Sequence, residues 1–120
     1  MDSATGEIYA MSTLRLNEDG TYSADSGNIA AVEANEPGSV AKVFSIAAAI
    51  NEGQVDSTTS FTVPPVFVAN KGTQWESAIR DAYPHGIEDM SVRKIFVDSS
   101  NVGTLMVGQT IGPDKLHDYL

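Results

Sequence analysis

The sequence predicts an α+β fold, with part of an antiparallel sheet near the N-terminus followed by a mainly helical portion. Residues 7–14 alternate in the manner of a strand, and residues 40–51 form an apolar run with good helix formers. After Ser91, the apolar spacing is typical of short helices. A chain of 120 residues has the size of one domain or a piece of a larger one, so a single core is expected.

Composition excludes several classes of partner and site. Seven Lys and Arg against sixteen Asp and Glu give a net charge of −9, which repels nucleic acid and anionic lipid. Without cysteine there is no disulfide, thiolate or Cys-based zinc site, and only His85 and His117 remain as imidazole ligands. We therefore expect no metal and no cofactor. The mostly apolar residues 43–50 fall far short of the roughly 20 that a membrane span needs.

The N-terminal third predicts a strand and a loop. Residues 1–6 are polar and typical of a tight turn, so the alternating residues 7–14 are expected to form a strand that follows it. Residues 15–35 are rich in Asn, Asp, Ser, Gly and Ala and show no sustained period. They predict a long loop, which could act as a flap over a cleft.

Residues 40–51 give the strongest helical pattern. Glu36-Pro37-Gly38 breaks the chain just before this segment, and Gly53 is a plausible C-terminal stop. Its apolar residues fall on nearly every face, which predicts a helix buried in the middle of a domain.

The remaining residues predict short elements. Two extended segments are expected in residues 55–68, around Pro64 and Pro65, followed by a polar connection over residues 69–86. Ser91 can cap a helix over residues 92–98. Two further helices are expected at residues 102–110 and 113–120.

Ser39 and Lys42 form a Ser-x-x-Lys pattern, which pairs a nucleophile with a base. At i and i+3 of a helix the two side chains share a face, so the amine can reach the hydroxyl. The pattern alone is weak, since a chain of this length contains one by chance roughly one time in three. Its context strengthens it, because Lys42 is the only charged residue in the apolar segment 40–50. Burial and the helix N-terminus would lower the pKa of the amine, as a base requires.

Ser99-Ser100-Asn101 is a second candidate, in which a hydroxyl and an amide could face a cleft. Ser and Asn are also common cap residues, so Ser99 or Ser100 could instead end one helix while Asn101 caps the next. His85 follows Pro84 in a polar loop, which is more typical of a surface or hydrogen-bonded histidine than of a catalytic one.

Four segments together resemble the transpeptidase domain of class B penicillin-binding proteins. They occur in the order and approximate spacing of that family and extend over most of the chain. The segments are residues 5–11 (TGEIYAM), 36–42 (EPGSVAK), 81–86 (DAYPHG) and 99–103 (SSNVG). The resemblance implies that residues 1–120 are part of one transpeptidase domain of the penicillin-binding fold.

The resemblance also implies roles for the two candidate patterns. Ser39 matches the nucleophile that attacks D-alanyl-D-alanine, and Lys42 matches the base that takes its proton. Ser99 matches the hydroxyl that relays a proton to the leaving amine, and Asn101 matches the amide that holds the substrate's peptide group. The backbone N–H of Ser39 matches one half of the oxyanion hole. The implied ligands are peptidoglycan stem peptides and β-lactam antibiotics.

The chain departs from the family pattern after Asn101, because no Lys-Thr-Gly or Lys-Ser-Gly motif follows. The expectation is therefore a fragment that is inactive alone. Its unpaired strand edge and uncovered apolar helix predict that it self-associates, by strand pairing or by exchange of its N-terminal hairpin between copies. The resemblance further implies a longer protein on the extracytoplasmic side of the bacterial cell membrane, anchored by an N-terminal membrane helix. This protein is expected to work with cell-wall synthesis proteins. Serine β-lactamases and penicillin-sensing receptors share the first two motifs and remain alternatives, as does a non-catalytic binding or structural fragment.

Overall fold

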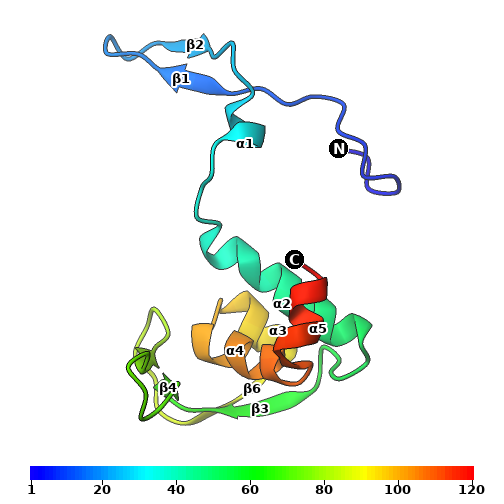
Figure 1. The fold of residues 1–120 in the computed structure, drawn as a ribbon, viewed down its shortest axis with the longest axis vertical. Helices are drawn as coiled ribbons and strands as arrows, with labels where there is room; N and C mark the ends of the chain where they lie inside the picture. The colour runs from blue at the N-terminus through cyan, green and yellow to red at the C-terminus, as the bar shows by residue number, and fades with distance from the viewer. The chain divides into compact units, whose positions relative to one another are not determined.

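The chain folds as two units, Met1–Glu36 and Pro37–Leu120, in a computed structural model that describes residues 1–120. Figure 1 shows their helices and strands. No helix has both the length and the apolar character that crossing a membrane would require.

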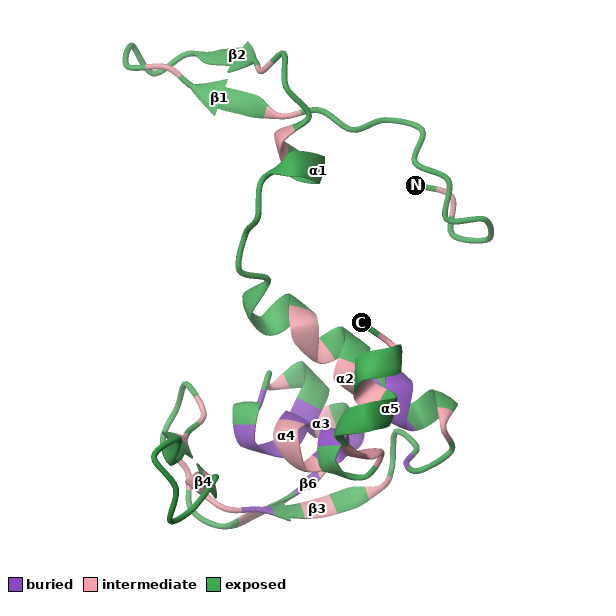
Figure 2. Cartoon of the chain, viewed as in Figure 1, coloured by how far each residue is buried: buried purple, intermediate pink, exposed green.

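The first unit holds one hairpin and one turn of helix. Strand β1 (Leu14–Leu16) pairs antiparallel with β2 (Tyr22–Ala24), and α1 (Ile29–Val32) follows. Gly20, with a φ of 81°, closes the hairpin turn by donating its N–H to the Asn17 carbonyl. No residue of this unit is buried (Figure 2).

Two predictions for this unit are wrong. The tight turn at residues 2–6 forms, but residues 7–13 are not a strand, because no neighbouring strand forms a ladder with them. Only the end carbonyls of the segment accept backbone N–H groups, Glu7 from Asp2 and Thr13 from Asp25. An alternating pattern becomes a strand only when a neighbouring backbone satisfies its N–H and C=O groups. Residues 15–35 are not a continuous loop, since they contain most of the hairpin and α1. The three-residue strands are too short to show alternation, and the turn residues 17–20 (NEDG) were the available signal.

Helix α2 (Lys42–Asn51) confirms the main helical prediction in the second unit. A 3₁₀ turn, η1 (Gly38–Ala41), precedes it, and Gly53 ends it with a φ of 65°. The expectation that α2 is enclosed on every face is wrong. Ile46, Ala48 and Ala49 are buried, whereas Val43, Phe44 and Ile50 lie on an exposed face.

The strands of this unit form two small antiparallel sheets. β3 (Ser60–Val63) pairs with β6 (Glu88–Ser91), and β4 (Phe67–Ala69) pairs with β5 (Ser77–Ile79). The two predicted extended segments are confirmed as β3 and β4, while β5 interrupts the expected polar connection.

The three C-terminal helices are confirmed within one or two residues at most ends. They are α3 (Val92–Val97), α4 (Asn101–Gln109) and α5 (Gly112–Asp118). Ser91 caps α3 as predicted, because its hydroxyl accepts the N–H of Lys94. The core lies between α2, α3, α4 and the β3–β6 sheet (Figures 1 and 2). It consists of Ile46, Ala49, Val55, Val63, Met90, Val92, Ile95, Val102 and Val107.

Gly103 lets α4 approach α3 closely. A Cβ atom at this position would lie 2.7 Å from Cγ1 and 2.9 Å from Cγ2 of the buried Ile95. The glycine of the sequence SSNVG therefore has a packing role, since any side chain here must displace the core.

Replacing Gly103 with alanine is expected to lower the free energy of unfolding by about 1–3 kcal/mol through overpacking. Gly108→Ala is the matched control, because a Cβ there meets only Leu116 Cδ2 at 4.0 Å, and alanine favours a helix. Urea unfolding of the 120-residue chain at one fixed concentration measures both variants. Equal stability of the two variants would contradict the packing role.

Candidate active site

Ser39 lies in the 3₁₀ turn that precedes α2. Gly38 adopts a φ of 55°, which turns the chain between Pro37 and the nucleophile candidate. The Ser39 side chain is exposed, and its hydroxyl has no hydrogen-bond partner in the chain. Its backbone N–H lies in the first turn, where such groups lack partners within the helix. Both groups are therefore available to a ligand.

Lys42 meets the second pattern instead of Ser39. Its Nζ donates to the hydroxyl of Ser99 at 3.0 Å and to the carbonyl oxygen of the same residue. The chain shows no hydrogen bond between Lys42 and Ser39. Burial lowers the pKa of the Lys42 ammonium below its ordinary value, and the charge of Asp81 offsets part of that effect. The direction agrees with the prediction for a general base.

Ser99 joins α3 to α4 with an uncommon backbone conformation. Its φ is 55°, in the left-handed region, and its N–H donates to the Phe96 carbonyl at 3.2 Å. Ser100 caps α4, because its hydroxyl accepts the N–H of Gly103 at 2.8 Å. The alternative in which Asn101 is the cap is therefore wrong, since Asn101 is the first residue of the helix.

A cavity of about 630 Å³ lies beside Lys42 and Asn101. Its other polar lining residues include Ser45 and Thr104, and its apolar wall comes from Ile79, Leu105, Pro113 and Leu116. Lys42 and Asn101, which belong to the two separate patterns, thus line one space large enough for a small ligand.

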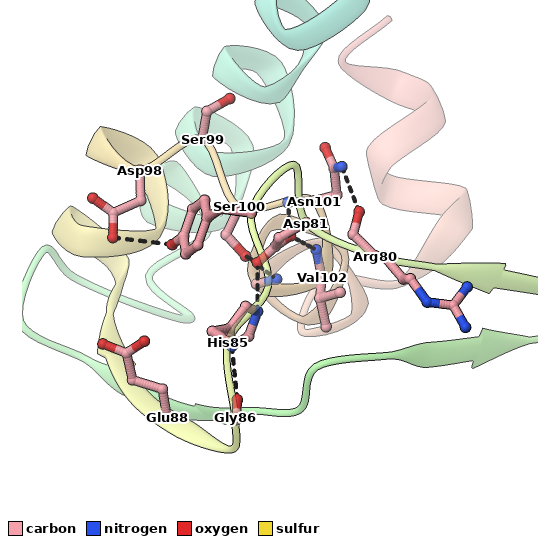
Figure 3. A network of polar contacts seen from close by, with 12 residues as sticks. Arg80, Asp81, His85, Gly86, Glu88, Asp98, Ser99, Ser100, Asn101 and Val102 are labelled. Carbon is pink, nitrogen blue, oxygen red and sulfur yellow. Dashed lines mark hydrogen bonds and ion pairs between the residues drawn. The ribbon is translucent and has the colours of Figure 1, made fainter.

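Asp81 contacts the turn that carries Ser99 and Asn101, and the sequence analysis did not predict this contact. Its carboxylate is fully buried beside the N-terminus of α4 and accepts hydrogen bonds from residues 100–102 (Figure 3). Burial raises the pKa of Asp81, but the hydrogen bonds from Ser100, Val102, Asn101 and His85 outweigh it and hold the pKa below its ordinary value. No local pattern signals a contact between residues 19 to 21 positions apart.

His85 is confirmed as a hydrogen-bonded histidine. Its Nε2 lies 3.0 Å from the Asp81 carboxylate, and its Nδ1 lies 2.7 Å from the Gly86 carbonyl oxygen. Its side chain is 7% exposed. Both ring nitrogens therefore face oxygen atoms of the protein. The chain contains no group of three His, Asp or Glu side chains that could hold a metal ion.

Comparison with known protein families gives a match that covers the whole chain. Residues 1–120 match the family model described as penicillin binding protein transpeptidase domain. The chain belongs to this family. The resemblance inferred from its four sequence segments is thereby confirmed.

Two relatives are similar in sequence to this chain over all or nearly all of its length. Penicillin-binding protein PbpB of Mycolicibacterium smegmatis is 36% identical over 125 residues, which cover 100% of this chain and 18% of the relative. Probable peptidoglycan D,D-transpeptidase PenA of Neisseria flavescens is 31% identical over 123 residues, covering 99% of this chain and 29% of the relative. The chain thus spans less than a third of the length of these two relatives. The family match favours a transpeptidase domain over a β-lactamase or receptor fragment.

Ser100→Ala tests the role of the buried hydroxyl in the SSNVG turn of the transpeptidase domain. The change removes the cap of α4 and the donor that lies 2.7 Å from Asp81. We expect the free energy of unfolding to fall by more than the typical ~1 kcal/mol for a lost cap. Ser91→Ala is the control, since Ser91 caps α3 with one bond of 3.2 Å. Urea unfolding that ranks Ser91→Ala as the more damaging variant would contradict this role.

Proposed function

We propose that the protein containing this chain is a peptidoglycan D,D-transpeptidase, and that residues 1–120 form part of its transpeptidase domain. Ser39, Lys42, Ser99 and Asn101 carry the reaction. The main support is the hydrogen bond between Lys42 and Ser99, which joins two motifs 57 residues apart in the sequence. The family match and the relatives named D,D-transpeptidases agree with it.

In the first step, Oγ of Ser39 attacks the carbonyl carbon of a D-alanyl-D-alanine stem peptide. Nζ of Lys42, in its neutral form, takes the hydroxyl proton. For this step the amine turns from Ser99, which it contacts in the free chain, toward Ser39 three residues before it. The negative charge that develops on the carbonyl oxygen is stabilised by the backbone N–H of Ser39 as one donor of the oxyanion hole. The lowered pKa of Lys42 supports this role, because it increases the fraction of neutral amine.

In the second step, the C–N bond breaks and D-alanine leaves as an amine. The proton held by Lys42 passes through the Ser99 hydroxyl to the leaving nitrogen. Asn101 holds the peptide group of the stem peptide beside the cavity. An acceptor amine of a second stem peptide then attacks the acyl ester and restores the Ser39 hydroxyl. A β-lactam enters by the first step, since opening its ring amide leaves the acyl group on Ser39.

The proposal also covers the substrates, inhibitors, partners and location of the protein. Peptidoglycan stem peptides are its substrates, β-lactams its inhibitors, and other cell-wall synthesis proteins its partners. It acts on the extracytoplasmic side of the bacterial cell membrane, held by an N-terminal membrane helix. The peptidoglycan role named for the PenA relatives supports this placement.

Covalent labelling by a fluorescent penicillin tests the assignment in the intact natural protein. Ser39→Ala is expected to abolish labelling, because no acyl acceptor remains. Lys42→Ala is expected to slow it on the order of a hundredfold or more, because the hydroxyl loses its base. Ser60→Ala and Lys71→Ala, at exposed positions outside the cavity, are the controls and should label normally. Labelling of Ser39→Ala at the control rate would disprove the assignment.

We also propose that the isolated 120-residue chain self-associates. Support comes from the exposed face of α2, where Phe44 is 50% exposed beside Val43 and Ile50. A groove of about 300 Å³ runs between this face and Phe96. In addition, each sheet has only two strands, so each strand offers one edge to another chain. The second copy covers apolar surface that water otherwise contacts.

Light scattering between roughly 100 and 1 micromolar chain tests this association, since mass action makes an oligomer dissociate on dilution. We expect the mean mass and the thermal unfolding temperature to fall together. Phe44→Glu is expected to shift the chain toward monomer, and Val32→Glu, at an exposed site in the other unit, is the control. A wild-type monomer with one cooperative transition at all concentrations would contradict the proposal.

A further inference from the structure

A single buried carboxylate organises the turn that carries Ser99 and Asn101. Asp81 lies in the connection between β5 and β6, and its side chain is 0% exposed. Its two oxygens accept the hydroxyl of Ser100 at 2.7 Å and the backbone N–H groups of Asn101 and Val102 at 2.5 and 3.0 Å (Figure 3). Three consecutive residues are thus fixed to one side chain. Charge-assisted bonds of this kind are about twice as strong as neutral ones.

The same loop fixes the side chain of Asn101. The Arg80 carbonyl oxygen accepts a hydrogen bond from Nδ2 of Asn101 at 2.7 Å (Figure 3). A carbonyl oxygen can only accept, so the nitrogen of the amide must face the loop. The oxygen of the amide is then left for the cavity, where it can accept an N–H from a ligand.

Ser99 depends on the same support. A left-handed φ of 55° in a serine costs free energy, and it persists only when the surroundings fix it. Phe96 holds the N–H of Ser99 on one side, and Asp81 holds residues 100–102 on the other. In this conformation the carbonyl and hydroxyl oxygens of Ser99 both face Nζ of Lys42.

Charge links the carboxylate to Lys42. The ammonium of Lys42 is bonded to Ser99, and Asp81 is the charged group whose field raises its pKa. Asp81 itself faces the ring of His85, and its field also reaches Asp98 and Tyr83. Asp98 is neutralised locally by an ion pair with Lys94 at 2.5 Å.

We propose that Asp81, held in place by His85, is the positioning residue of this site: it fixes Ser99 and Asn101 opposite Lys42. The inference rests on the proposed transpeptidase function. Asp81 touches no reacting atom, since its carboxylate is buried and its oxygens are occupied by the turn and by His85. It acts through the geometry of the two motif residues and through its charge.

The test compares acylation of the intact natural protein and its Asp81→Asn variant by a fluorescent penicillin across a range of pH. We expect the plateau rate to fall on the order of a hundredfold, because the turn that places Ser99 and Asn101 loses its anchor. We also expect the acid limb to move to lower pH, because without the Asp81 charge the pKa of Lys42 drops further and more neutral amine is present. A residue with only a structural role would not move this limb.

Asp56→Asn is the matched control. The Asp56 carboxylate likewise accepts the backbone N–H groups of Thr58 and Thr59, at 2.7 and 2.8 Å, but it lies outside the cavity. Its acylation rate and its acid limb should equal those of the wild type. His85→Asn provides a second variant that leaves the carboxylate in place. It should acylate more slowly than the wild type, because Asp81 loses one of its bonds.

Folded Asp81→Asn and His85→Asn proteins that acylate at the wild-type rate, with an unmoved acid limb, would overturn the inference. A slower Asp81→Asn protein whose limb does not move would also overturn it, since the loss would then be one of fold alone. If Asp81→Asn does not fold, His85→Asn decides, and its acylation at the wild-type rate overturns the inference. Failure of the transpeptidase proposal is separate, because the wild type would then show no Ser39-dependent acylation.

Discussion

The packing of α2 against α4 is the contact on which the whole site depends. Ile46 and Ala49 lie four and seven residues after Lys42, so all three share one face of α2. Burial of the two apolar residues in the core turns that face toward α4. Lys42 is thereby carried to the N-terminal end of α4, where Ser99 precedes the cap. Burial of apolar side chains is not directional, but here it fixes the rotation of α2 and so places the Lys42 amine beside Ser99.

The helices and the motif residues could be predicted from the sequence, whereas the contacts between them could not. The apolar run with its flanking breaks predicted α2, and Ser91 predicted the start of α3, because caps and helix periodicity are local signals. The hydrogen-bond partner of Lys42 is Ser99, which is 57 residues away in the sequence. The Ser-x-x-Lys spacing predicted a contact with Ser39 instead, because a spacing pattern can indicate only contacts between residues close in sequence. Residues 7–13 failed as a strand for the same reason, since pairing is not local.

The exposed acidic residues and the buried Asp81 have different roles in this chain. Sixteen acidic residues against seven basic ones give a net charge of −9, which favours solubility and repels polyanions. Asp81 differs from the exposed acids because burial would make its charge costly without compensation. Hydrogen bonds from four neighbouring residues supply that compensation, so the carboxylate stays charged inside the fold. The loop that carries it could not be recognised from composition, which counts acids without placing them.

The five residues of SSNVG divide into two groups that a sequence motif cannot separate. Ser100, Val102 and Gly103 are buried and serve the fold, as a cap, a core side chain and a close contact with Ile95. Ser99 and Asn101 are exposed and direct polar atoms toward Lys42 and the cavity. The two exposed residues depend on the three buried ones, because the left-handed Ser99 and the capped start of α4 set the backbone from which both side chains project. The packing of the three buried residues of SSNVG therefore determines where the polar atoms of Ser99 and Asn101 lie.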